Sequence, residues 1–430
     1  MSKVNTQPYK GARDFYPEDM MFQKWMFDKW RRVVERYGYA EYDAPILERT
    51  ELYLMKGSEE IVNDQTYTFK DRSDRSVTMR TEMTPSVSRM VAGRRQEIAY
   101  PARWYSIPNL WRYERMQRGR LREFWQLNVD VFGVKSDLAE LEMIQIVDDL
   151  FQAFKAKRTS YTIKINSRVM VNTMLANLHL TDNQASAAIR LIDKIDKMEP
   201  QKFAEALDSI TGSKDISKRI VDLLRTTKIE DLPFRLRETG NAKSLERILK
   251  ACAQLGIQNI KFDISLMRGF DYYTDIVFEV FDNDPENNRS MFGGGRYDGL
   301  VAQFGVEAVP TVGFGVGDVT FADFLNTHGL VPKLKTANEL TILLRDDSLD
   351  GAQKIARELR EMNVNTAVDY SGKKIDKQMK AAKKSGVKYV LFIDEKDIKE
   401  EIFTLKNLHN DKEQRHSLQR IVSLVKDARG

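Results

Sequence analysis

The chain is poor in the residues that build several common kinds of site. Cys252 is the only cysteine among 430 residues, which excludes a disulfide within the chain and a cluster of thiolate metal ligands. The 4 histidines lack the spacing of metal ligands, and we expect no structural zinc. No window approaches the roughly 18 consecutive apolar residues of a membrane span, and residues 1–11 lack the apolar core of a signal peptide. We therefore expect a cytoplasmic protein without a membrane partner.

Length and charge set further limits. A chain of 430 residues, 42% of them hydrophobic, is too long for one ordinary core, and we expect two or three domains. The 68 basic residues exceed the 63 acidic residues by only 5, so the net charge gives a weak indication of a polyanionic partner. The positions of the basic residues are more informative than their number.

The first part of the chain predicts a sheet with helices packed on it. Apolar residues at helical spacing predict a helix over residues 21–37, and Pro45 marks the next extended segment as an edge strand or a bulge, which could face a second subunit. Strand-like patterns over residues 103–114 and 121–132 flank a basic turn at residues 115–120. This arrangement predicts a long antiparallel hairpin with a positively charged tip.

Changes in sequence pattern divide the chain into four regions. Residues 1–170 and 257–330 are expected to form one α+β domain in two parts, an antiparallel sheet flanked by helices. Residues 171–256 are mostly helical and carry no chemical motif, so we expect a helical insertion. Beyond a linker near residues 330–338, alternating strands and helices predict a small α/β domain over residues 338–430.

The predicted hairpin carries charged residues that suit a polyphosphate. Arg112 and Glu114 share one face of a strand, as do Gln126 and Asp130, because strand side chains alternate. A guanidinium can bind a phosphate through two parallel hydrogen bonds, and Arg120 at the tip could hold another phosphate. An isolated Arg-x-Glu pair is usually a solvated ion pair. Together with an aromatic at position 124 and glycine-rich segments downstream, the pattern favours a triphosphate site.

A second stretch of interest is MRGFDYYTDIVFEV, residues 267–280. Its Tyr272 and Tyr273 precede an apolar strand, where paired tyrosines usually serve packing, and Arg268 beside them could neutralise a carboxylate or a developing charge. The following GGGRYDGL, residues 293–300, either lets the backbone approach a ligand closely or forms a tight turn. It matches neither a Walker loop nor a dinucleotide-binding loop.

These segments resemble the histidyl-tRNA synthetase family, a branch of the class II aminoacyl-tRNA synthetases. The resemblance covers nearly everything outside the helical insertion. It runs through YKGARDFYP, DAPILE with Pro45, MRTEMTPSVSRMVA from Met79, the Arg112 hairpin, RGFDYYT and GGGRYDGL. Several independent matches in the family's order make chance agreement very improbable.

The resemblance implies a role for each matching residue. The substrate would be L-histidine, with Glu82 and Thr84 at its α-amino group and Asp130 and Tyr273 at its imidazole. Gln126 and Tyr272 would line the same pocket, and Met83 and Arg268 would also belong to the histidine site. Arg112 would hold the α-phosphate and the substrate carboxylate, Glu114 and Arg120 would belong to the ATP site, Phe124 would stack on adenine, and Arg268 would be the family's own catalytic arginine.

The resemblance also implies the reaction and its partners. Histidine would be activated with ATP and Mg²⁺ to an adenylate and then transferred to the 3′ end of tRNA, by a chain that forms a homodimer. Residues 338–430 would read the anticodon, although the lysine run from Lys373 to Lys384 is by itself usually a solvated face. Two other readings stay open, a catalytically silent synthetase-like regulatory subunit that senses histidine or tRNA, and a general RNA-binding protein.

One position departs from the family. The third class motif usually ends in Gly-x-Glu-Arg, with the arginine on the γ-phosphate, whereas this chain has Gly317, Asp318, Val319 and Thr320. Because Thr320 carries no charge, we expect another arginine near the site, Arg296 for example, to compensate.

Overall fold

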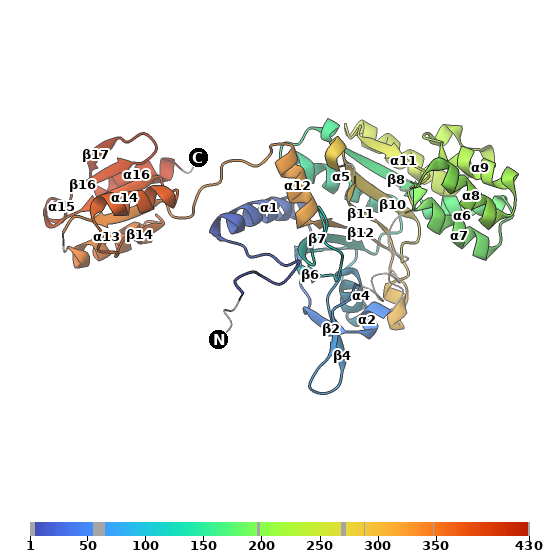
Figure 1. Ribbon diagram of the computed structural model, residues 1–430, viewed down its shortest axis with the longest axis horizontal. Helices are drawn as coiled ribbons and strands as arrows, with labels where there is room; N and C mark the ends of the chain where they lie inside the picture. Colours follow the sequence, from blue (N-terminus) through green and yellow to red (C-terminus); the bar gives the residue numbers. More distant parts are fainter. Residues whose placement is uncertain are drawn as a thin grey trace. The chain divides into compact units, whose positions relative to one another are not determined.

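The computed structural model describes residues 5–54, 65–195, 198–267, 272–287, 289–346 and 348–428. It contains two compact units, one formed mainly by Met26–Val331 and the other mainly by Pro332–Gly430 (Figure 1). We describe each unit by itself.

The first unit is built on a mixed sheet. Within the described residues its strands are hydrogen-bonded in the order β1 (Ala40–Glu41), β5 (Ala102–Ser106), β7 (Glu123–Phe132), β12 (Thr311–Gly317), β11 (Ser290–Arg296), β10 (Ile276–Asp282), β8 (Tyr161–Ser167) and β9 (Ile260–Phe262), and β6 (Asn109–Trp111) pairs with β7. The pairs β1–β5 and β8–β9 are parallel, and the others are antiparallel. The predicted α+β fold, an antiparallel sheet flanked by helices, is therefore confirmed in its central strands.

Helices α1 (Pro17–Arg36), α5 (Leu138–Ala153) and α12 (Asp318–Thr327) meet through aromatic side chains. The Phe321 ring of α12 lies 5.4 Å from Trp30 of α1 and 5.4 Å from Phe151 of α5. Phe151 also stacks 6.0 Å from Phe292 of β11. Fully buried rings of this size supply much of the apolar area that holds helices against a sheet.

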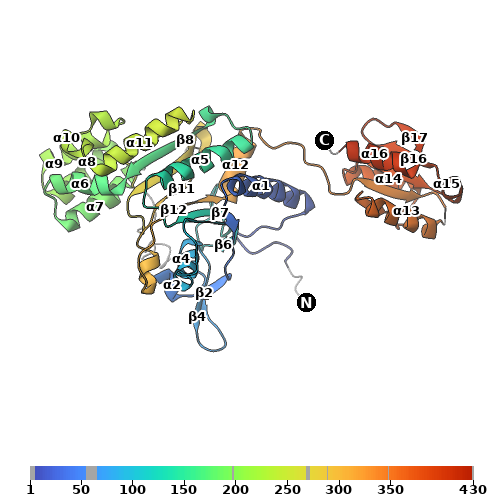
Figure 2. The same cartoon turned by 180° about the vertical axis from the view of Figure 1, so that it is seen from behind.

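The first unit also contains a small sheet with the strand order β2 (Leu47–Arg49), β4 (Ser76–Met79), β3 (Thr68–Lys70). Helices α2 (Glu51–Leu54) and α4 (Thr84–Gly93) lie beside it. The helical region contains α6 (Arg168–Asn177), α7 (Asp182–Ile192), α8 (Pro200–Thr211), α9 (Lys214–Leu224), α10 (Phe234–Arg237) and α11 (Gly240–Gln254). Figures 1 and 2 show α6–α9 gathered beyond β8 and β10. Several of these helices begin at a Ser or Thr whose side chain accepts a backbone N–H, as Thr181 and Thr239 do.

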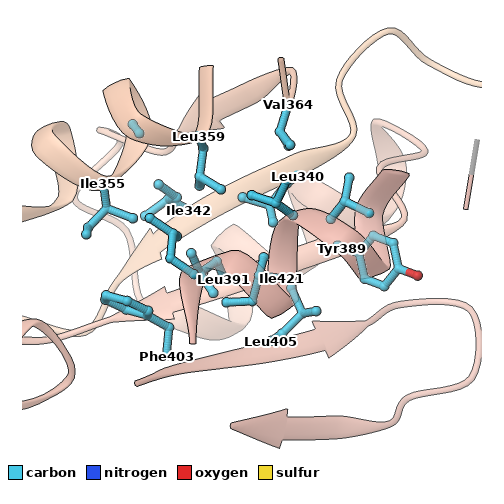
Figure 3. Close-up of a cluster of buried hydrophobic side chains, with 14 of the residues drawn as sticks. Leu340, Ile342, Ile355, Leu359, Val364, Tyr389, Leu391, Phe403, Leu405 and Ile421 are labelled. Carbon is cyan, nitrogen blue, oxygen red and sulfur yellow. The ribbon is translucent and has the colours of Figure 1, made fainter. Parts of the chain in front are cut away.

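The second unit is an α/β domain with strands in the order β14 (Thr366–Val368), β13 (Leu340–Leu344), β15 (Tyr389–Ile393), β16 (Phe403–Asn407) and β17 (Glu413–His416). Its helices are α13 (Leu349–Glu361), α14 (Ile375–Lys384), α15 (Glu395–Glu400) and α16 (Leu418–Asp427). Figure 3 shows the buried aliphatic core, in which Ile342, Leu391 and Ile421 are fully buried. None of the helices within the described ranges is long and apolar enough to cross a bilayer.

Candidate active site

A cavity of about 260 Å³ in the first unit brings together residues from distant parts of the chain. Its lining includes most of the side chains singled out from the sequence, namely Glu82, Thr84, Arg112, Glu114, Arg120, Phe124, Gln126, Asp130, Tyr272 and Tyr273. Asn128, Tyr297, Gly313, Gly315 and Thr320 also line it. The hairpin, the start of α4, the segment before β10 and the strands β11 and β12 all contribute to one site.

Strand β7 provides three polar side chains to the cavity because the side chains of a strand alternate between its two faces. Gln126, Asn128 and Asp130 line the cavity, whereas Leu127 and Val129 between them are fully buried. Successive side chains on a strand point to opposite faces, so the polar residues share one face and the apolar residues pack in the core. The prediction that Gln126 and Asp130 share a face is confirmed. Asn128 could have been found by the same spacing.

Glycines on β11 and β12 make the room for these side chains. Gly313 pairs with Asp130, and a Cβ atom at Gly313 would collide with the Asp130 carboxylate. A Cβ at Gly315 would lie 2.8 Å from Cδ of Gln126, and one at Gly295 would lie 2.9 Å from Cδ1 of Tyr273. The glycine run of GGGRYDGL therefore forms a strand rather than a tight turn. The missing side chains at Gly295 on β11 and at Gly313 and Gly315 on β12 leave room for the side chains that line the cavity.

We call Glu82, Asp130, Tyr272, Tyr273 and Tyr297 the carboxylate–tyrosine set. The Tyr297 hydroxyl donates to Asp130, and burial raises the pKa of Asp130 to about 7 although this hydrogen bond opposes the rise. The Tyr272 hydroxyl donates to Oε2 of Glu82 at 3.0 Å. Burial raises the pKa of Glu82, and the positive charge of Arg112 opposes that rise. Two buried carboxyl groups thus lie beside phenolic donors in one pocket.

The three rings of this set pack against one another. The Tyr272 ring centroid lies 5.0 Å from that of Tyr273 and 5.6 Å from that of Tyr297. Burial raises the pKa of all three hydroxyls well above the usual value, so they stay protonated and act as hydrogen-bond donors. Packed rings fix the positions of their hydroxyls, which suits recognition of a small polar molecule.

We call Arg112, Glu114, Arg120 and Phe124 the hairpin set. The Arg112 Nε donates to the Thr81 carbonyl at 2.9 Å, and its guanidinium lies 5.3 Å from the centre of the Phe124 ring. The Glu114 carboxylate lies between the two arginines, 3.8 Å from Nη1 of Arg112 and 3.5 Å from Nη1 of Arg120. Two guanidinium groups at one cavity are an arrangement that binds phosphate oxygens.

Known proteins share both the sequence and the fold of this chain. A family model described as histidyl-tRNA synthetase matches residues 11–317, and one described as an anticodon binding domain matches residues 332–428. The histidine–tRNA ligase of Leptospira biflexa serovar Patoc is 40% identical over 412 residues, which cover 94% of each chain. That of Pyrococcus horikoshii is 32% identical over 427 residues, 97% of this chain and 98% of the relative. The chain belongs to the histidyl-tRNA synthetase family.

Solved structures of this family have the same fold. The crystal structure of histidyl-tRNA synthetase from Nostoc sp. PCC 7120 matches with a TM-score of 0.85 at 22% identity, over 99% of this chain and 100% of that chain. A structure described as an ATP phosphoribosyltransferase regulatory subunit/histidyl-tRNA synthetase from Bacillus halodurans matches with a TM-score of 0.74 at 22% identity, over 88% of this chain and 97% of that chain. At this identity the likeness concerns the fold alone.

Some residues predicted from the resemblance to histidyl-tRNA synthetases lie elsewhere. Met83 is fully buried and does not line the cavity, although Glu82 and Thr84 on either side do. Arg268 lies outside the described residues. The expectation that Arg296 compensates for Thr320 is wrong. Arg296 is buried and donates to Glu140 from Nε at 2.6 Å and from Nη2 at 2.8 Å, so its charge is used away from the cavity.

Tyr297 is the most informative residue that the sequence did not single out as a site residue. It follows Arg296 in GGGRYDGL, and its hydroxyl reaches Asp130 from the far end of β11. The two are 167 positions apart in the chain, so no local pattern connects them. The only available signal was its place within a motif of the histidyl-tRNA synthetase family.

Proposed function

We propose that this chain carries out the reaction of its family, the ATP-dependent ligation of histidine to tRNA, in the cavity described above. The observation that carries the proposal is the presence in one cavity of a buried carboxylate–tyrosine set and an arginine-bearing hairpin set. The first suits a small molecule with N–H groups, and the second suits a triphosphate. The activation step joins two such substrates.

The carboxylate–tyrosine set would bind histidine. Asp130 and Tyr273 would contact the imidazole, Glu82 and Thr84 the α-amino group, and Gln126 and Tyr272 would line the pocket. A buried carboxylate that needs an N–H partner discriminates strongly against isosteres that lack that donor, because its charge would otherwise stay unpaired. The burial of Asp130 and its hydrogen bond from Tyr297 support this role.

The hairpin set would bind ATP. Arg112 would hold the α-phosphate and the histidine carboxylate, Glu114 and Arg120 would complete the site, and Phe124 would stack on adenine. A carboxylate oxygen of histidine then attacks the α-phosphorus, and pyrophosphate leaves with the electrons of the broken P–O bond. Such a step depends on positioning and on stabilising the charge of the transition state, and needs no side-chain nucleophile.

Mg²⁺ would accompany ATP. Mg²⁺ keeps several of its waters and is bound by one or two carboxylates together with substrate phosphates. Glu114, the carboxylate between the two hairpin arginines, fits that need. The ion would neutralise part of the phosphate charge. Among the described residues no group of three or more histidine, cysteine or acidic side chains is placed to hold a metal by itself.

Transfer to tRNA would follow in the second step, with Arg268 assisting catalysis as the family resemblance implies. In our proposal residues 1–170 and 257–330 form the catalytic domain, residues 171–256 form an insertion, and residues 338–430 bind the anticodon through lysines such as Lys377 and Lys380. We further propose a cytoplasmic homodimer. A two-fold dimer is the commonest assembly, and Leu47 and Phe69 expose apolar surface on the small sheet.

Two assays test the proposal. The chain should exchange labelled pyrophosphate into ATP only when histidine is present, and should then load histidine onto tRNA. Exchange with no amino acid preference would refute the assignment of the carboxylate–tyrosine set. Histidine binding without any exchange would favour the regulatory subunit, which no observation favours at present.

A further inference from the structure

The cations that line the cavity come from the hairpin. Among the described residues that line it, the arginines are Arg112 and Arg120, and no lysine is present. The beginning of α12 reaches the same cavity through Val319 and Thr320, which are uncharged. Asp318 before them is buried and accepts from Nη2 of Arg13 at 2.7 Å and from the Trp125 N–H at 2.9 Å. The described beginning of α12 therefore offers no cationic side chain to a triphosphate there.

What α12 offers instead is a docking place for the tip of the hairpin. The Thr320 hydroxyl donates to the carbonyl groups of Met291 at 3.1 Å and Gly317 at 3.2 Å, which holds the side chain against β11. Its Cγ2 methyl would lie 3.2 Å from a Cβ atom at Gly119, which has a positive φ of +77°. The tip therefore rests on Thr320 through a glycine. A long side chain at position 320 would occupy the space that the tip uses.

An ion pair fixes the tip in that place. Arg118 donates to Asp323 of α12 from Nε at 2.9 Å and from Nη2 at 3.3 Å, one bond to each carboxylate oxygen. Its Nη1 also donates to the Glu286 carbonyl at 3.2 Å. A further bond joins Nη1 of Arg289 to Oε1 of Gln117 at 2.8 Å. A planar guanidinium held on three sides sets orientation as well as distance.

Arg120 lies two residues after Arg118, the residue that holds the tip on α12. Its N–H donates to the Gln117 carbonyl at 2.9 Å, so the turn between them is closed by a backbone hydrogen bond. Its guanidinium lies 3.5 Å from Glu114 at the cavity. The contact of the hairpin tip with α12 therefore determines the position of the Arg120 guanidinium at the cavity.

We propose that the Arg118–Asp323 pair is a positioning device that clamps the hairpin tip onto α12, so that Arg120 supplies at the cavity the positive charge that α12 lacks. The inference rests on the proposed function, because it concerns the phosphates of ATP. Arg118 and Asp323 act through Arg120 and touch no reacting atom. The Arg118 side chain is 51% exposed and that of Asp323 is 28% exposed, and a pair so open to water contributes little to stability, so its removal should alter ATP binding rather than folding.

The test is histidine-dependent ATP–pyrophosphate exchange by the full chain. Arg118→Ala and Asp323→Ala should each raise the Michaelis constant for ATP about tenfold while the Michaelis constant for histidine and the thermal midpoint stay near the wild-type values. The swap of Arg118→Asp with Asp323→Arg should restore the ATP constant to within about threefold of wild type. Arg115→Ala, which removes a charge from the same tip and leaves the pair intact, is the matched control and should change neither constant.

Three results would overturn the inference. They are an unchanged ATP constant in both single variants, an equal rise in the Arg115→Ala control, and a swap no better than the worse single variant. A rise in both substrate constants together with a fall in the thermal midpoint would show a merely structural role and count against it too. Failure of the proposed function is distinguishable, because the wild-type chain would then show no histidine-dependent exchange.

Discussion

The two sets of side chains that share the cavity are held in different ways. The carboxylate–tyrosine set is mostly buried, and its rings pack on one another above glycine-bearing strands. The hairpin set extends to an exposed tip, where Arg120 is 61% exposed and is oriented by ion pairs. Burial makes a carboxyl group selective because its charge must find a partner. Exposure lets Arg120 exchange water for phosphate at little cost, whereas the Arg112 side chain is only 17% exposed and is held by the Thr81 carbonyl.

This contrast leads to different expectations for substitutions in the two sets. Changes in the buried set should affect histidine and leave ATP binding nearly intact. Changes in the hairpin set should do the reverse, except at Arg112, whose guanidinium acts on Glu82 of the buried set and lies near Glu114 of the hairpin set. Of the substitutions below, Asp130→Asn and Gly313→Ala test that separation in the buried set.

Arg112→Ala should have the largest effect. The side chain is proposed to stabilise the charge that develops at the α-phosphorus, and loss of such a group typically costs about 10²–10³ in rate. We expect kcat/KM for exchange to fall about 10³-fold for both substrates. Steady-state exchange measurements at varied histidine and ATP check this. A kcat/KM within tenfold of the wild-type value would contradict the proposed role of Arg112 at the α-phosphorus.

Asp130→Asn should come next and should separate the substrates. The amide keeps the shape of the side chain but loses the charge that an imidazole N–H would meet, at a cost of about 2–3 kcal/mol. We expect kcat/KM for histidine to fall about 100-fold while the Michaelis constant for ATP changes less than about threefold. Equal losses for both substrates would break the separation.

Gly313→Ala should reproduce part of that effect although no polar side chain is replaced. The new Cβ atom would collide with the Asp130 carboxylate and lie 2.8 Å from the Val129 carbonyl. We expect kcat/KM for histidine to fall about tenfold and stability to fall by about 1–3 kcal/mol. Gly299→Ala is the control, because a Cβ there meets nothing within 4 Å. If both variants behave like wild type, the glycines are not what keeps the pocket open.

Thr320→Arg should have a smaller effect, and it should weaken ATP binding rather than strengthen it. The substitution introduces the residue that the third class motif usually carries, yet the tip of the hairpin already occupies the space beside position 320. We expect the Michaelis constant for ATP to rise about threefold to tenfold rather than fall. Titration of ATP in the exchange assay decides this. A fall in the constant would mean that the tip yields and that the cavity accepts a second cation from α12.

The smallest expected effect is on the pH dependence of the stability of the fold. Burial raises the pKa of Asp130 to about 7, whereas an unfolded aspartate titrates near 3.9. Between these values the folded chain binds the proton more strongly than the unfolded chain, so this group's contribution to stability decreases as pH rises from about 4 to about 7. Asp130→Asn removes that contribution. Its thermal midpoint relative to wild type should therefore rise between pH 5 and pH 8, and a constant difference would contradict the assignment.

Local patterns in the sequence were sufficient for much of the fold. Alternation along residues 121–132 predicted β7 and the shared face of Gln126 and Asp130, because a strand repeats every two residues. The alternation of strands and helices predicted beyond the linker agrees with the order β13, α13, β14, α14 and β15. Strands β16 and β17 and helices α15 and α16 were not predicted.

Contacts between distant residues could not be predicted in this way. The glycines at 293–295 were compatible with a turn or a close approach, and only pairing with β10 and β12 shows them as strand. Arg296 was named as one arginine that could compensate for Thr320, but its partner Glu140 lies 156 positions away. The hydrogen bond from Tyr297 to Asp130 likewise joins residues that are far apart in the chain. Side-chain partners fixed by tertiary packing leave no trace in local spacing.

A crystal structure of the chain with histidine and a non-hydrolysable ATP analogue tests the central claim most directly. The account predicts an imidazole N–H within about 2.7–3.2 Å of the Asp130 carboxylate and phosphate oxygens at similar distances from Arg112 and Arg120 in the same cavity. Histidine bound away from Asp130, or a triphosphate that meets neither arginine, would contradict it.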